Sequence, residues 1–190
     1  STIPIGIEVQ KVVMSNSIIT GNGEGTAIEL QANGQSTITN SLITDNNIGI
    51  SISGTSGNFD FQNNNFTKNS LYTIQNLNTR TVEAMNNYWG TNDQTEIDTN
   101  IYHYDDDDAV GEVTYIPYNT TSNALAIMAP PINVSKKQVG TDVVISWSAN
   151  SESNLTGYKL YYGNPTGLTY DNVVDLENVN TYLIANATLE

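Results

Sequence analysis

Asparagine recurs at a fixed interval through the first half of the chain. Four asparagines follow one another at steps of 24, 23 and 23 residues, and a second set of four repeats the same steps. The first set is Asn16, Asn40, Asn63 and Asn86, and the second is Asn22, Asn46, Asn69 and Asn92. Because the apolar segments within each repeat are too short to fold alone, this interval predicts a solenoid in which each coil stacks on the one before it.

The residue types within the repeats predict strands and not helices. Asn, Ser, Thr and Gly disfavour the helix interior, and the apolar residues show no period of 3.6. Apolar residues instead alternate over short segments, for example at Ile28 and Leu30 and at Ile50 and Ile52. Residues two apart in a strand share a face, so these pairs are expected to point into one interior. The sequence therefore predicts an all-β chain.

These repeats resemble those of right-handed parallel β-helix proteins of the pectate-lyase-like superfamily. Such coils carry patterns like Asn-x-Ile-x-x-Asn-x-x-Gly-Ile-x-Ile, and residues 40–52 read NSLITDNNIGISI. The resemblance covers residues 1–118 and implies a parallel β-helix over that range. It leaves the function open, because the fold includes lyases, hydrolases, adhesins and inert spacers.

The first asparagine set is predicted to be structural. Asparagine tolerates left-handed backbone, and its side-chain amide can bond to the neighbouring coil. We therefore expect Asn16, Asn40, Asn63 and Asn86 to be structural, and Asn40, Asn63 and Asn86 to stack in adjacent coils with their side chains directed inward.

The segment that follows the last repeat predicts a C-terminal cap. Residues 86–118 resemble the closing segment of many secreted β-helix proteins, in which an Asn-(Tyr/Trp)-Trp-Gly turn precedes an acidic stretch. The ring of Trp89 is expected to cover the open end of the core, and the acidic loop to prevent pairing of the last coil with another edge.

A second module is expected after a linker. Residues 119–129 have the composition of a linker, and residues 130–190 resemble the first two thirds of a fibronectin type III sandwich. The expected strands are 143–147, 158–162 and 181–184, with Trp147 in the core. Two strands of such a sandwich are missing from the sequence, so a strand-donating partner chain or further residues are expected to complete it.

Charge and composition exclude several partners. Six Lys and Arg stand against 20 Asp and Glu, which gives a net charge of −14. Nucleic acid and anionic membranes are therefore poor partners, and no apolar segment is long enough for membrane insertion. The absence of cysteine excludes disulfides and thiol catalysis.

An acidic run near the predicted cap is a candidate metal site. Calcium prefers six to eight oxygen ligands, and carboxylates are concentrated at Asp105, Asp106, Asp107, Asp108 and Glu112. The run is interpreted either as a calcium site or as a solvated acidic loop, and no cofactor is required. The only histidine, His103, is expected at the surface, without the partners of a catalytic triad.

Three functions remain open from the sequence. The first is a non-catalytic extracellular or cell-surface fragment, acting as spacer, adhesin stalk or carbohydrate-binding surface, with a polysaccharide or neighbouring protein chains as partner. Strand alternation places Tyr161 away from the second module's core, where it could stack on a sugar ring. The alternatives are the C-terminal part of a polysaccharide lyase or glycoside hydrolase with its catalytic coils upstream, and a subunit of an extracellular filament.

Overall fold

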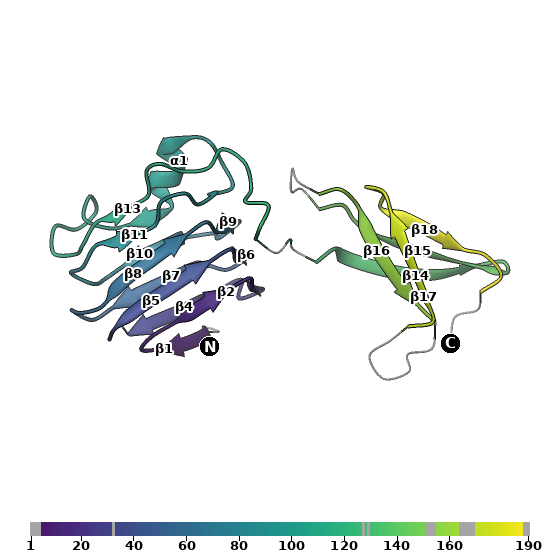
Figure 1. The fold of residues 1–190 in the computed structure, drawn as a ribbon, viewed down its shortest axis with the longest axis horizontal. Coiled ribbons are helices and arrows are strands. Elements are labelled where there is room, and N and C mark those ends of the chain that lie inside the picture. Colours follow the sequence, from purple (N-terminus) through teal and green to yellow (C-terminus); the bar gives the residue numbers. More distant parts are fainter. Residues whose placement is uncertain are drawn as a thin grey trace. The chain divides into compact units, whose positions relative to one another are not determined.

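The chain forms two units, Ser1–Met128 and Ala129–Glu190 (Figure 1). The computed structural model describes residues 5–31, 33–126, 128, 130–150, 155–163 and 170–187. Within this part of the chain, no helix is long and apolar enough to cross a membrane.

The first unit is a solenoid built from three parallel sheets (Figure 1). The first sheet contains, in order, β1 (Ile5–Val9), β4 (Thr26–Gln31), β7 (Ile48–Ser53), β10 (Tyr72–Asn76) and β12 (Ile101–Tyr102). The second contains β2 (Val13–Ser15), β5 (Gln35–Thr39), β8 (Asn58–Gln62), β11 (Val82–Glu83) and β13 (Val113–Thr114). The third contains β3 (Ile18–Thr20), β6 (Leu42–Thr44) and β9 (Asn65–Thr67). The predicted solenoid is thereby confirmed.

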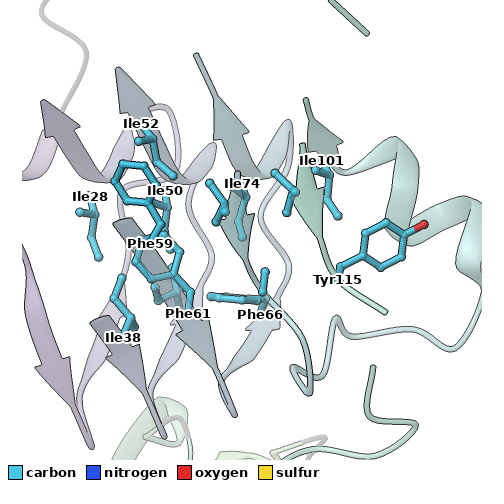
Figure 2. Close-up of a cluster of buried hydrophobic side chains, with 14 of the residues drawn as sticks. Ile28, Ile38, Ile50, Ile52, Phe59, Phe61, Phe66, Ile74, Ile101 and Tyr115 are labelled. Carbon is cyan, nitrogen blue, oxygen red and sulfur yellow. The ribbon is translucent and has the colours of Figure 1, made fainter. Parts of the chain in front are cut away.

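The core forms because like residues stack between coils. Ile28 pairs with Ile50, and Ile50 pairs with Ile74 in the next coil. In the second sheet Ile38 pairs with Phe61. All of these side chains are fully buried in the interior between the sheets (Figure 2). The 23-residue repeat therefore builds one continuous apolar column, and its burial is the main stabilising contribution.

The first asparagine set is only partly as predicted. Asn16, Asn40, Asn63 and Asn86 all have left-handed backbone, with φ between 47° and 59°. Their side chains do not point inward, however, because Asn16 and Asn63 are exposed and Asn40 and Asn86 are half-buried. Each left-handed residue lies at the bend after a strand of the second sheet, and the residue that follows it, buried at Ser41, Asn64 and Asn87, is directed inward instead.

These following residues form a hydrogen-bonded column that we call the turn ladder: Ser17, Ser41, Asn64 and Asn87. The Ser17 N–H donates to Ser41 Oγ at 3.2 Å, and the Ser41 N–H donates to Asn64 Oδ1 at 3.0 Å. The Asn64 N–H then donates to Asn87 Oδ1 at 2.7 Å. Ser41, Asn64 and Asn87 are completely buried, so the turn ladder satisfies backbone groups that water cannot reach.

The second asparagine set forms a similar column over three coils. Asn22 donates from both its backbone N–H and its Nδ2 to Asn46 Oδ1, each at 3.2 Å. Asn46 makes the same two bonds to Asn69 Oδ1, at 3.3 and 3.1 Å. Asn92 is exposed and lies outside this column.

The C-terminal end of the solenoid is closed by an aromatic cluster and a short helix. Trp89 is only 6% exposed, and its ring lies 5.2 Å from Phe66 and 6.0 Å from Tyr115 between centroids. Helix α1 (Gln94–Thr99) is N-capped by the Asp93 side chain and buries Ile97 against the core. The expected burial of Trp89 is confirmed.

The predicted linker is wrong for most of its length, because residues 119–126 pack against the first unit. We call this segment the strap. The Asn123 N–H donates to Asn65 Oδ1 at 2.7 Å, and Asn65 Nδ2 returns a bond to the Asn123 carbonyl at 3.3 Å. Asn123 Nδ2 also donates to Asn40 Oδ1 and to the carbonyl of Asn63. One asparagine thus ties the strap to two successive coils.

Asn123→Ala is expected to loosen the strap and to lower the free energy of unfolding by about 1–2 kcal/mol, because Asn40 Oδ1 and the Asn63 carbonyl lose the Asn123 Nδ2 donor. Hydrogen exchange should show faster exchange within residues 119–126, above all at Leu125, whose N–H donates to Asn123 Oδ1 at 3.0 Å. Leu125→Ala is the control, because this side chain is exposed and should change stability by less than about 0.5 kcal/mol. Equal effects of the two variants would contradict the role of Asn123.

The second unit contains two antiparallel sheets. One has the order β14 (Ile132–Val139), β15 (Asp142–Ser148), β18 (Thr181–Ile184), and the other pairs β16 (Tyr158–Tyr162) with β17 (Asn172–Leu176). The three strands expected from the sequence are confirmed within β15, β16 and β18. The Trp147 ring is buried and lies 5.1 Å from that of Tyr158. The fibronectin type III likeness and the strand-donating partner remain predictions.

Candidate functional site

A histidine and two carboxylates meet at the capped end of the solenoid. Asp98 comes from α1, His103 follows β12, and Asp105 lies two residues further on. His103 Nε2 lies 3.8 Å from Asp98 Oδ1 and 3.9 Å from Asp105 Oδ2. His103 is 5% exposed, so its predicted surface position is wrong. The ring lies against β13, where it accepts a hydrogen bond from the Val113 N–H. We call these three residues the cap cluster.

The hydrogen bonds of His103 determine which nitrogen carries its proton. The Val113 N–H donates to His103 Nδ1 at 3.2 Å, so Nδ1 acts as an acceptor and Nε2 carries the hydrogen of the neutral ring. A histidine that binds metal through Nε2 normally donates its Nδ1–H to a carbonyl or carboxylate. Val113 instead presents a donor to Nδ1. The Nε2–H of His103 thus faces the two carboxylates at distances longer than a hydrogen bond, and His103 does not fit a metal ligand.

The cap cluster is joined to the aromatic cluster through Asp98. The Tyr115 hydroxyl donates to Asp98 Oδ1 at 3.1 Å. Burial of the Tyr115 ring, together with this bond to Asp98, raises the pKa of Tyr115 above its ordinary 10.0. Since Tyr115 also contacts Trp89, the bond from Tyr115 fixes Asp98 and thereby connects α1 to the closed core.

The predicted calcium ligands do not converge. Asp106 Oδ2 accepts the His103 N–H at 3.1 Å, and Asp107 Oδ1 accepts the Ala109 N–H at 3.0 Å. Asp108 and Glu112 are exposed. Among the described residues, the three donors that lie within 4.8 Å of one another are those of the cap cluster, to which Asp105 alone of the acidic run contributes. The four aspartates and Glu112 thus form no cluster of three close donors within the described residues, and the calcium site stays a prediction.

We expect zinc to leave the melting temperature of the protein unchanged within about 1 °C, because the Nε2 proton of His103 occupies the position a metal would need. Thermal melts with excess zinc, with excess calcium and with neither test this, with His103→Gln and Asp106→Asn as variants. A zinc-dependent rise in melting temperature that His103→Gln removes would contradict the assigned proton position.

A second candidate surface lies on the two-stranded sheet of the second unit. Tyr161, which the sequence places outside the core, is 51% exposed. Its ring lies 6.2 Å from that of Tyr170, which is 47% exposed, with 51° between the ring planes. On the same sheet Lys159 Nζ lies 3.1 Å from Asp175 Oδ1, and this hydrogen bond to Asp175 raises the pKa of Lys159 above its ordinary 10.5.

Two of these residues were not identified from the sequence. Asp98 lies in a six-residue helix that the strand pattern did not indicate. Tyr170 precedes β17, and only the antiparallel pairing of β16 with β17 brings it to Tyr161. Tyr170 could have been found from the sequence. The apolar segment at 173–176 predicts a strand that can pair with β16, and this pairing would bring Tyr170 close to Tyr161.

Comparison with known proteins identifies the type of repeat but no individual related protein. Residues 5–89 match the family model described as a right-handed β-helix region. No curated protein and no solved structure matches the chain significantly. The matched range begins at β1 and ends at Trp89, so it covers the coils from β1 to β11 and leaves out α1, β12 and β13.

Proposed function

We propose that this chain, with its right-handed β-helix repeat, is a non-catalytic structural segment of an extracellular or cell-surface protein. The β-helix acts as a stiff spacer, and the second unit is the module that it presents. The resemblance of residues 86–118 to the closing segments of secreted β-helix proteins supports the extracellular location.

The observation that carries this proposal is how the polar side chains of the solenoid are used. The buried ones, such as Asn46, Asn64 and Asn87, bond to neighbouring coils. In the cap cluster, His103 Nδ1 is occupied by Val113 and Asp98 by Tyr115. General acid–base catalysis needs groups within reach of a substrate proton. The buried asparagines and His103 instead hold the fold together, and Asp98 and Asp105 are the members of the cap cluster that face solvent.

Activity assays on a panel of polysaccharides test the proposal against the enzymatic alternatives. The chain should release neither reducing ends, as a glycoside hydrolase does, nor unsaturated products, as a lyase does. Asp98→Asn and His103→Gln should change stability alone. Turnover by the wild-type chain that either substitution abolishes would overturn the proposal and assign a catalytic role to the cap cluster.

A further inference from the structure

One face of the β16–β17 sheet gathers exposed rings and one ion pair. Lys159 and Tyr161 are two residues apart on β16 and therefore share a face. Lys159 pairs with Asp175 and Tyr161 with Val173 across the two strands. With Tyr170 beside Tyr161, these five residues form a continuous surface, which we call the tyrosine face.

Packing among the described residues of the second unit does not explain the tyrosine face. Tyr158, on the opposite side of β16, contacts the buried Trp147 and so belongs to the core. Tyr161, Tyr170 and Val173 each keep about half of their surface in water. Apolar side chains grouped on a surface and bordered by charges are typical of binding sites, whereas single exposed ones are ordinary.

The chemistry of the tyrosine face matches a pyranose ring. Such a ring has an apolar face of C–H bonds, which packs on aromatic rings, and hydroxyl groups around its edge. The Asp175 carboxylate can accept hydrogen bonds from these hydroxyls, and the Lys159 ammonium can donate to them. The tyrosine face therefore offers both kinds of contact that a sugar ring makes, aromatic packing and hydrogen bonds.

The charge of the ligand follows from the charge of the protein. The ion pair between Lys159 and Asp175 is neutral as a whole, while the chain carries a net charge of −14. A polyanion would be repelled, and the tyrosine face offers no unpaired cation to hold it. A neutral sugar avoids this repulsion.

We propose that the tyrosine face binds neutral pyranose units of a polysaccharide, which stack on Tyr161 and Tyr170 while Lys159 and Asp175 hold their hydroxyls. This binding goes beyond the spacer role and is tested separately from it.

Affinity electrophoresis of the whole chain tests the binding. The gels contain hydroxyethyl cellulose, xylan or galactomannan as neutral probes, and polygalacturonate as the anionic probe. The wild-type chain should be retarded by at least one neutral probe and not by polygalacturonate. Tyr161→Ala and Tyr170→Ala should each weaken that binding about tenfold, whereas Tyr161→Phe, which keeps the ring, should bind nearly as the wild type does.

Tyr104→Ala is the matched control. Tyr104 is 54% exposed but lies in the first unit, so its removal should leave the retardation unchanged. The melting temperatures of all variants should agree with that of the wild type. The proposal is overturned if no neutral probe retards the wild type, if only polygalacturonate does, or if Tyr161→Ala and Tyr170→Ala bind as Tyr104→Ala does. None of these outcomes affects the spacer role, which rests on the first unit.

Discussion

Trp89→Ala is expected to lower the free energy of unfolding of the first unit by about 3–5 kcal/mol. The indole is almost fully buried between Phe66 and Tyr115, at the point where the core would otherwise open to water. Its removal costs the transfer free energy of a large ring and leaves a cavity that the stacked strands cannot collapse to fill. Urea denaturation followed by circular dichroism measures the change.

Two further variants serve as controls for Trp89→Ala. Tyr104→Ala removes an exposed aromatic ring near the same cap and should cost less than about 0.5 kcal/mol. Trp89→Phe keeps an aromatic ring against Phe66 and should lose clearly less stability than Trp89→Ala. If Trp89→Ala were no worse than Tyr104→Ala, Trp89 would not be closing the core.

Asn64→Ala should cost about 3 kcal/mol or more, although it removes a polar side chain. Asn64 Nδ2 donates to the carbonyls of Ile38 and Gln62 at 2.7 and 3.1 Å, and Oδ1 accepts the Ser41 N–H at 3.0 Å. Alanine removes these three hydrogen bonds to backbone groups. Loss of a buried hydrogen-bond partner costs about 1–3 kcal/mol, and the shift of the urea midpoint reports the combined cost.

The neighbouring asparagine provides the control for Asn64. Asn63 is exposed and has φ 59°, so Asn63→Gly preserves the left-handed turn while removing the side chain. Its expected cost is below about 1 kcal/mol. Comparable losses in Asn63→Gly and Asn64→Ala would show that the turn ladder contributes nothing beyond the turn itself.

The sequence was sufficient to predict the solenoid, because stacking forces the repeat to appear as columns of like residues. It could not identify the inward asparagines. Asn63 and Asn64 are adjacent, as are Asn86 and Asn87, so the interval alone fits either column. The choice depends on the left-handed φ of Asn63 and Asn86, which directs the following side chain into the interior. The preference of asparagine for left-handed backbone predicts the turn, but it does not predict which side chain points inward.

The cap cluster and the strap could not be predicted from the sequence for a different reason. Neither has a repeat, and both depend on contacts between residues distant in sequence. His103 is buried because Val113, ten residues later, returns to bond its ring. Asn123 pairs with Asn65, 58 residues earlier. The composition of residues 119–129 predicted a linker. The sequence alone does not distinguish polar side chains that bond to a protein surface from polar side chains that face water.

Amide hydrogen exchange at Ser41 tests the turn ladder, and with it the stacked-coil structure, most directly. The Ser41 N–H lies in a turn, and its acceptor is Asn64 Oδ1 in the next coil. Its exchange should therefore be as slow as that of the core strand amides, which open only on global unfolding. Asn64→Ala should speed exchange at Ser41 by more than the loss of overall stability explains. Exchange at Ser41 as fast as at the exposed Gly23 would contradict the stacked coils and the asparagine bonds that join them.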